Sequence, residues 1–271
     1  MMARADLGGW RQRSTVVLFA LCGICFADAP ISPDNRLDDL LARTNTQVTG
    51  FLDQFSDVKC TEQVEQEKIG KDGKVELKEE STYDYLVILT NPGGELSLDE
   101  SRLPVREAKH DKKNRPLLVS NGFATLFLVF HSYYAQSFKF VLLPEETLDG
   151  QQFFKIGFEH IPGTRSPAAL ALRGREYPLE LSGTAWIDPR TGVIAKIAAG
   201  IANTLEDVGL KSLQSEVKFA PDPFHDLKEP HWFPVQASVE VETPRQHWRN
   251  THRFTDYKRF SVSTEEQVAT K

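Results

Sequence analysis

Apolar and polar residues alternate in short segments between residues 58 and 260, and tight-turn signals separate these segments. An alternation with a period of two places one set of side chains in a core and the other in water, as in a half-buried β-strand. The clearest alternation lies near the C-terminus and comprises Val235, Ala237, Val239 and Val241. The pattern predicts a mainly antiparallel β-fold of the α+β class.

Two of the turns have distinctive sequences. Asp72-Gly73 suits the centre of a tight hairpin, whose return strand we expect over Val75–Leu89. In Asp188-Pro189-Arg190-Thr191-Gly192, the proline fixes its backbone angle and the glycine can adopt a left-handed conformation. Elsewhere we expect a short strand pair over Glu95–Ala108 and a long loop over Ile161–Arg175.

One helix should precede the strands. Ser32, Pro33 and Asp34 fit a helix N-terminus, with a capping hydroxyl, a proline in the first turn and an acid at the positive end of the helix dipole. Apolar residues then recur at three- and four-residue steps, at Leu37, Leu40, Leu41, Val48, Phe51, Leu52 and Phe55. The residues on the expected solvent side are Arg36, Asp38, Asp39, Arg43 and Gln47. We therefore expect an amphipathic helix that packs one face against the core.

The first 27 residues have the order of a secretory signal peptide. Three arginines precede an apolar run from Val16 to Phe26, and we expect cleavage after Ala27. The run is shorter than the ~20 residues that a membrane-spanning helix needs. We expect the mature chain to be periplasmic or secreted and to have no transmembrane segment. The alternative is that the apolar run is retained as a membrane anchor.

The mature chain, residues 28–271, is expected to form one domain, because no long Pro/Ser/Gly linker divides it, with a frayed polar tail over residues 263–271. Cleavage leaves 29 basic and 37 acidic side chains, a balance of −8, which disfavours nucleic acid as a partner. Cys60 is then the one remaining cysteine, so we expect a buried thiol and no intramolecular disulfide. We expect a monomer held together by a packed core.

Two features predict a large apolar surface. The segment Gly122–Phe130 is the most apolar stretch of the mature chain, which indicates a short, enclosed two-turn helix on the concave face of a sheet. On two neighbouring strands, side chains of one face form a broad aromatic and aliphatic surface. These residues are Phe138, Phe140 and Leu142 on one strand and Phe154, Ile156 and Phe158 on the other.

Motifs for catalysis and cofactor binding are missing from the sequence. It has no phosphate-binding glycine loop, dinucleotide fingerprint, nucleophile elbow or metalloprotease histidine pair. The best group of potential metal ligands comprises His225, His231, His247, His252, Asp222 and Asp226. His247 and His252 are five apart on an expected strand and so face opposite sides, which argues against zinc. We therefore expect no enzyme activity, metal or cofactor.

Two segments carry a resemblance to a known family. Residues 183–194 read Gly-Thr-Ala-Trp-Ile-Asp-Pro-Arg-Thr-Gly-Val-Ile, and residues 253–260 read Arg-Phe-Thr-Asp-Tyr-Lys-Arg-Phe. The Trp-Ile-Asp-Pro strand end and the Tyr-x-x-Phe closing strand resemble the outer-membrane lipoprotein carrier (LolA/LolB-like) superfamily, and within it a group of uncharacterised exported bacterial proteins. The resemblance covers most of residues 34–262 in element order. It implies a curved, incomplete barrel of about eleven antiparallel strands around helices, with a hydrophobic concavity that takes acyl chains in the carriers.

We expect an exported binding protein that holds a lipid-like or other hydrophobic small molecule, lipoprotein acyl chains among the candidates. A lipoprotein or another envelope protein is a candidate partner. The expected lining residues are Phe127, Phe130, Phe140, Leu142, Phe154, Ile156, Phe158 and Trp186. An interaction or scaffold module whose core is filled by residues 122–130 is the alternative, and an envelope hydrolase built from acids or histidines that meet on folding is a more remote one.

Overall fold

The computed structural model describes residues 33–55, 58–90, 96–105, 126–172, 175–205, 209–221 and 232–259. Contacts within the chain separate Met1–Ser32 from Pro33–Lys271, and all described residues belong to the second unit. The expected signal peptide, the tail over residues 263–271 and the start of the apolar segment, residues 122–125, lie outside the described residues.

The described elements are twelve strands and three short or medium helices. The strands are β1 (Val58–Ile69), β2 (Val75–Thr90), β3 (Ser97–Pro104), β4 (Phe138–Leu148), β5 (Gln151–His160), β6 (Ala169–Leu172), β7 (Arg175–Pro178), β8 (Leu181–Ile187), β9 (Ile194–Ile201), β10 (Ser212–Pro221), β11 (Trp232–Glu242) and β12 (His247–Arg259). The helices are α1 (Pro33–Phe55), the 3-10 helix η2 (Leu126–Phe130) and α2 (Ser132–Ala135).

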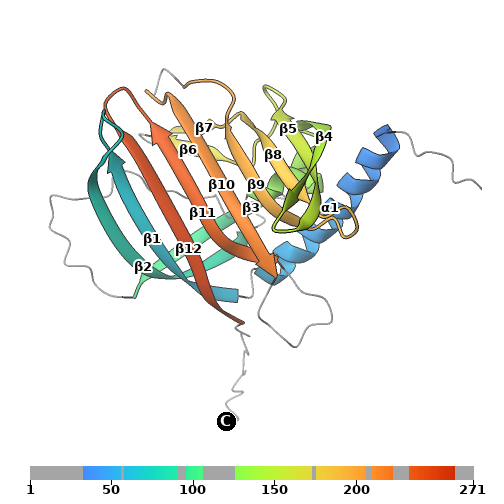
Figure 1. Cartoon of the computed structure of the whole chain (residues 1–271), viewed down its shortest axis with the longest axis horizontal. Coiled ribbons are helices and arrows are strands. Elements are labelled where there is room, and N and C mark those ends of the chain that lie inside the picture. The colour runs from blue at the N-terminus through green and yellow to red at the C-terminus, as the bar shows by residue number, and fades with distance from the viewer. Residues whose placement is uncertain are drawn as a thin grey trace, which may run out of the picture. The chain divides into compact units, whose positions relative to one another are not determined.

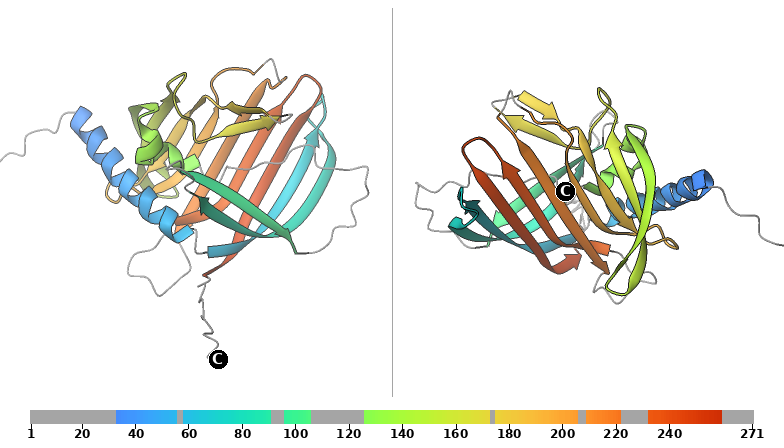
Figure 2. Two further views of the ribbon diagram at one scale, coloured as in Figure 1. Left: turned by 180° about the vertical axis from the view of Figure 1, so that it is seen from behind. Right: turned by 45° about the horizontal axis from the view of Figure 1, so that its top comes forward.

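Ten strands form one open antiparallel sheet in the order β3-β2-β1-β12-β11-β10-β9-β8-β5-β4, and β6 and β7 form a separate hairpin. The sheet is one face of the molecule in Figure 1, and α1, η2 and α2 lie on its other, concave side in the reverse view of Figure 2. This architecture confirms the predicted α+β class and the curved, incomplete barrel.

The two edge strands of the sheet, β3 and β4, are connected through α2. The Tyr134 hydroxyl of α2 donates a hydrogen bond to the Leu96 carbonyl oxygen, 2.6 Å away and directly before β3. At the other end of α2, the Ser137 amide donates to the Tyr134 carbonyl oxygen at 2.8 Å, and β4 begins at the next residue. The short helix is thus bonded to the chain beside both edge strands.

Helix α1 begins at Pro33, as the sequence predicts, and buries a stripe with a four-residue step. The stripe consists of Leu40, Thr44, Val48 and Leu52, which are at most 3% exposed. Leu37, Leu41 and Phe51 flank it and pack against the same core. The amphipathic prediction is therefore confirmed. No helix among the described residues combines the length and hydropathy required to cross a membrane.

All five residues of η2 are buried, which confirms that the described part of the apolar segment, residues 126–130, is enclosed. Its described part is a 3-10 helix, whereas the sequence suggested a regular two-turn helix. Side chains that are apolar on every side leave such a segment no favourable place except the interior.

Two local predictions are wrong. Within Glu95–Ala108 the described residues contain one strand, β3, which pairs with β2 rather than with a second short strand. The loop expected over Ile161–Arg175 contains β6, which pairs with β7. In both places the partner strand decided the outcome, because strand formation depends on neighbours that a local pattern does not include.

The alternation in β11 is confirmed except at one residue. Ala237, Val239 and Val241 are buried, whereas Val235 is 38% exposed. Pairing between β10 and β11 changes register at this point, since Lys218 pairs with Gln236 and the next residue of β10 pairs with Pro234. A bulge of this kind leaves one residue out of the alternation.

Candidate ligand cleft

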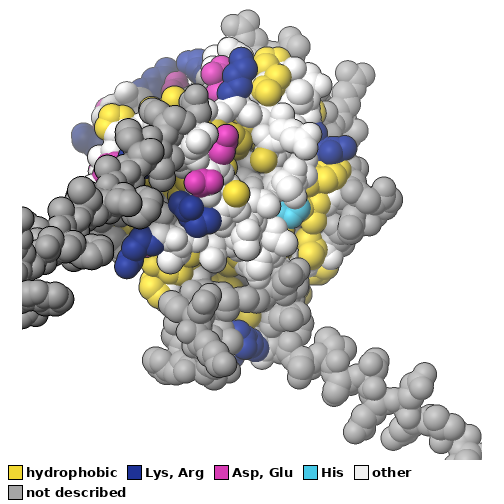
Figure 3. All heavy atoms as spheres, turned by 90° about the vertical axis from the view of Figure 1, so that its right-hand side faces the viewer, with side chains coloured by type: hydrophobic (Ala, Val, Ile, Leu, Met, Phe, Trp, Pro, Cys, Tyr) yellow, Lys and Arg dark blue, Asp and Glu magenta, His cyan; other side chains and the backbone are white. Residues whose placement is uncertain are grey.

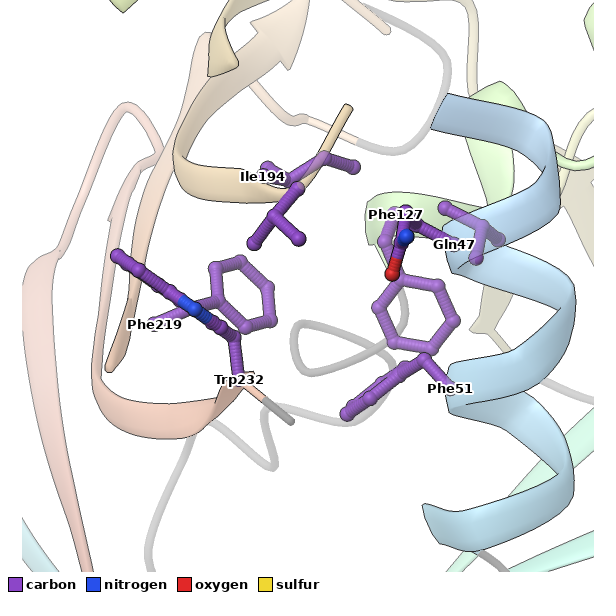
Figure 4. Close-up of a pocket in the computed structure, with 8 residues that line it drawn as sticks. Gln47, Phe51, Phe127, Ile194, Phe219 and Trp232 are labelled. Carbon is purple, nitrogen blue, oxygen red and sulfur yellow. The ribbon is translucent and has the colours of Figure 1, made fainter. Parts of the chain in front are cut away.

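An apolar cleft lies between α1, η2 and the concave side of the sheet. The empty space between its lining residues is about 430 Å³, a figure that includes open solvent at the mouth, so the enclosed part is smaller. The lining residues are Gln47, Val48 and Phe51 of α1, Phe127 of η2, Val193, Ile194 of β9, Phe219 of β10 and Trp232 of β11. Figure 4 shows Ile194, Phe219 and Trp232 on one side and the residues of α1 and η2 on the other.

The turn between β8 and β9 seats α1 beside the cleft. Gly192 has a φ of 79°, and a Cβ there would lie 2.8 Å from the Arg43 carbonyl carbon and from the Thr44 amide nitrogen. Asp188 fixes the turn, because its Oδ1 accepts hydrogen bonds from two later turn amides at 2.8 and 3.1 Å. The turn predicted from the sequence therefore also sets how closely the helix approaches the sheet.

Polar contacts hold α1 at three further points. The Arg43 guanidinium donates to the Pro189 carbonyl oxygen at 3.1 Å. The Asn45 side-chain oxygen accepts a hydrogen bond of 2.7 Å from the first amide of α2. Nearer the start of the helix, Arg36 pairs with Glu145 on β4 at 2.9 Å. These contacts hold about the first three turns of the helix, from Arg36 to Asn45.

Phe51 joins α1 to both walls of the cleft. Its ring centroid lies 4.8 Å from that of Phe127, with the planes at 88°, and 6.4 Å from that of Phe219. The centroid of Phe233 is 5.6 Å away. Edge-to-face aromatic pairs contribute about 0.5–1.5 kcal/mol beyond their buried area. The apolar wall is thus built from interlocking rings.

Among the described residues that line the cleft, Gln47 has the one side chain that both donates and accepts hydrogen bonds, and the Trp232 indole carries one N–H donor on an otherwise apolar ring. In Figure 4 the Gln47 amide extends from α1 toward the cleft. No hydrogen bond joins this amide to another described residue. The sequence pattern placed Gln47 on the solvent side, but the residue lies four positions before Phe51 and therefore shares its side of the helix. Helical periodicity does not distinguish a solvent-facing position from one that faces an open cleft.

The aromatic surface predicted on β4 and β5 forms, and the chain's own helices cover it. The Phe130 ring of η2 lies 5.4 Å from Phe140 and 6.0 Å from Phe158. The Arg36 guanidinium of α1 lies 4.2 Å from the centre of the Phe154 ring. These aromatic residues contribute to the core in this structure.

Trp186 differs from its expected position in the concavity. It pairs with Lys155 and Lys196 on the adjacent strands, and the Lys196 ammonium lies 3.7 Å from the ring centre. Its neighbour Ala185 is fully buried in the core. Because successive strand residues point to opposite faces, Trp186 lies on the outer face of the sheet.

Of the predicted lining residues, Phe127 alone borders the cleft. The six that belong to the packed core or pack against it are Phe130, Phe140, Leu142, Phe154, Ile156 and Phe158. The cleft residues that the sequence analysis missed are Gln47, Val48, Phe51, Val193, Ile194, Phe219 and Trp232. Each fits an ordinary helix or strand pattern, so no local signal marked them as a group.

A buried ionic cluster occupies the inner face of β1, β3 and β12. The fully buried Glu62 carboxylate accepts hydrogen bonds from Arg102 Nε at 2.6 Å and Nη2 at 3.0 Å. His252 Nδ1 lies 2.8 Å from Glu62 Oε1, and Arg102 also pairs with Glu100 at 2.9 Å. Burial alone would raise the pKa of Glu62, but the hydrogen bonds from His252 and Arg102 lower it below its ordinary value of 4.5. The mutual pairing of these charges indicates a structural role.

The potential metal ligands do not converge in the described part of the chain. His247 Nε2 lies 2.6 Å from Oε1 of the exposed Glu240, whereas His252 is buried beside Glu62, so the prediction that the two histidines face opposite sides is confirmed. Among the described residues, no three His, Cys, Asp or Glu side chains are grouped to hold a metal ion. The other four candidates, His225, His231, Asp222 and Asp226, lie outside the described residues.

Figure 3 shows the side of the molecule that lies at the right of Figure 1, where the visible hydrophobic side chains form several groups with charged side chains between them. The candidate site is the cleft beneath α1, because of its apolar lining.

Two solved structures resemble the chain distantly. One is a DUF1329 family protein from Desulfovibrio piger, with 12% identity and a TM-score of 0.43, covering 89% of this chain and 96% of that one. The other, from Vibrio parahaemolyticus, is provisionally described as an outer membrane lipoprotein-sorting protein domain. It has 10% identity and a TM-score of 0.42, and the match covers 86% of this chain and 93% of that one. No family model and no curated protein matches the chain. At such low similarity, the fold assignment rests on the strand order of this chain itself.

Proposed function

We propose that this protein is a non-catalytic binding protein that holds a lipid-like or other hydrophobic ligand in the cleft between α1, η2 and the sheet. The observation that carries the proposal is the cleft lining, in which seven apolar side chains, four of them aromatic, accompany a single amide. A mostly apolar lining with few polar groups is typical of small-molecule sites. Each alkyl CH₂ group buried there contributes about 0.8 kcal/mol to binding.

The proposal includes an exported location. The leader-like sequence of residues 1–27 supports it. The resemblance of residues 183–194 and 253–260 to the lipoprotein carriers supports lipoprotein acyl chains as one ligand. A lipoprotein or another envelope protein is then the partner from which such a chain is received.

A second candidate function is that of an interaction or scaffold module with a filled core. The observation in its favour is η2, whose five side chains are buried and whose Phe130 covers the aromatic surface of β4 and β5. The two candidates differ in one respect: a binding protein takes up a ligand beside Phe127, and a scaffold does not.

Tryptophan fluorescence tests the proposal, because Trp232 borders the cleft and Trp186 lies on the outer face. A bromine atom on an acyl chain quenches an indole that it contacts. We expect a methyl ester brominated at mid-chain to quench the emission of the wild type and of Trp186→Phe in a saturable way. In Trp232→Phe, the saturable part of the quenching should disappear.

A matched pair of variants tests whether the cleft itself is the site. Val193→Phe places a ring in the cleft and should weaken binding by about tenfold or more, because an overfilled site must rearrange to accept the ligand. Val141→Phe adds the same ring at a position that is 54% exposed on β4, and binding should be unchanged. Equal binding by the two variants, or no saturable quenching of the wild type, would contradict the proposal and favour the scaffold.

A further inference from the structure

We infer that the ligand is electrically neutral and carries a hydrogen-bonding oxygen, in an ester, amide or hydroxyl group, beside its hydrocarbon chain, and that Gln47 selects for this group. The inference rests on the proposed function and narrows it from hydrophobic ligands in general to one chemical class.

The charge of the cleft favours a neutral ligand. No described residue that lines the cleft carries a charge. The neighbouring Arg43 is exposed, and its guanidinium donates to the Pro189 carbonyl oxygen at 3.1 Å. An ionised carboxylate or phosphate in the cleft would lose its hydration without gaining a counter-ion, which is among the most unfavourable changes in protein binding. Ionised fatty acids therefore fit this site poorly.

The Gln47 amide favours a ligand with a polar oxygen. It extends toward the cleft and forms no hydrogen bond with another described residue. Water can satisfy the amide while the cleft is open, but an entering ligand displaces that water. A pure hydrocarbon would then leave the amide unsatisfied, whereas a carbonyl oxygen accepts from its NH₂ group and a hydroxyl can pair with either end.

The arrangement of the lining also orients the ligand. Gln47 lies on α1, and across the cleft Ile194 and Phe219 are purely hydrocarbon, while Trp232 adds one indole N–H to an apolar ring (Figure 4). A ligand oxygen that pairs with Gln47 faces α1, and the hydrocarbon of the ligand then faces the sheet. Gln47 thus contributes both to the choice of ligand and to its orientation.

Three ten-carbon ligands test the inference: methyl decanoate, decanoate at pH 8 and decane, each displacing the neutral fluorophore N-phenyl-1-naphthylamine. We expect the wild type to bind methyl decanoate more tightly than either of the others. Gln47→Leu should weaken the binding of methyl decanoate by about three- to tenfold, which is the range expected for one lost hydrogen bond. The affinity for decane should be unchanged or higher. Leucine is a good helix former, and Gln47→Met provides a second, unbranched apolar replacement.

The matched control is Gln214→Leu, which makes the same change at an exposed position on β10 and should leave all three affinities as in the wild type. Decanoate that binds as tightly as its methyl ester would overturn the neutral-ligand inference. An ester-to-decane affinity ratio that is the same in Gln47→Leu as in the wild type would overturn the role of Gln47. If neither the fluorophore nor any of the three ligands binds the wild type, the proposed function itself fails, and the inference fails with it.

Discussion

Arg102 on the edge strand β3 and Glu62 on β1 form a two-point ion pair, with N–O distances of 2.6 and 3.0 Å, across the intervening strand β2. Glu62 is fully buried, and the Arg102 side chain is 18% exposed. The pair ties the edge of the sheet to its interior, so its loss should affect the whole fold rather than one strand.

We expect Arg102→Met to lower the free energy of unfolding by about 3 kcal/mol, because it leaves the Glu62 carboxylate buried without its arginine partner. Urea denaturation measures the change. The control is Lys78→Met, which removes surface ion pairs with Glu65 and Glu80 and should change stability far less than Arg102→Met, because solvent screens these charges. Equal effects of the two variants would show that the buried pair contributes no more than a surface pair.

The stability of the protein should depend on the ionisation of Glu62. The pKa of Glu62 is lowered from 4.5 in the folded protein, so its carboxylate stabilises the fold fully above that value. This contribution is lost as the pH falls from 4.5 through the lower folded pKa. We expect the stability difference between the wild type and Glu62→Gln to be constant at neutral pH and to shrink below 4.5, measured by urea denaturation at each pH. A difference that grows toward acid pH would contradict the prediction.

Cys60 should be unreactive in the folded protein. Burial raises the pKa of its thiol to about 12, although a hydrogen bond with Tyr257 acts in the opposite direction. Because the thiolate is the reactive species, iodoacetamide at pH 8 should leave Cys60 unmodified in buffer and modify it in urea. Mass spectrometry of the peptide that contains Cys60 measures this directly. Rapid alkylation without denaturant would mean that the site opens readily.

Gly192→Ala should destabilise the protein more than Gly209→Ala. Both glycines have positive φ, 79° and 74°, so alanine costs about 1 kcal/mol at either position from backbone strain. At Gly209 a Cβ meets no described atom within 4 Å, whereas at Gly192 it meets the α1 backbone at 2.8 Å. We expect a further loss of about 1–3 kcal/mol for Gly192→Ala in thermal or urea unfolding. Equal losses would mean that α1 moves away without penalty.

The sequence predicted the elements whose signals are local. Helix α1 begins at Pro33, and the hairpin turn at Asp72-Gly73 forms, with Gly73 at a φ of 78° and the Lys74 amide bonded to Asp72 Oδ1 at 3.1 Å. The turn at Asp188–Gly192 also forms, with Gly192 in the left-handed conformation. These features depend on residues adjacent in the chain, so they could be predicted without a structure.

The cleft could not be predicted in this way, because its lining comes from five segments of the chain that meet only in the folded protein. Val48 and Phe219 have the same local pattern as any core residue. The sequence predicts Trp186 in the concavity, together with the apolar residues of adjacent strands, but the pairing of Lys155 and Lys196 with it places all three on the outer face. Strand register, which a single sequence does not encode locally, decides which face a residue occupies.

The pairing of β1 with β12 has a consequence for the order in which the molecule can assemble. These strands join residues about two hundred positions apart, such as Val58 and Arg259. Until β12 is present, no strand pairing joins the meander of β1–β3 to the sheet formed by β4, β5 and β8–β11. The sheet can therefore be completed only when the last strand is available, and a chain that ends before His247 should consist of two separate partial sheets, each with an exposed edge open to aggregation.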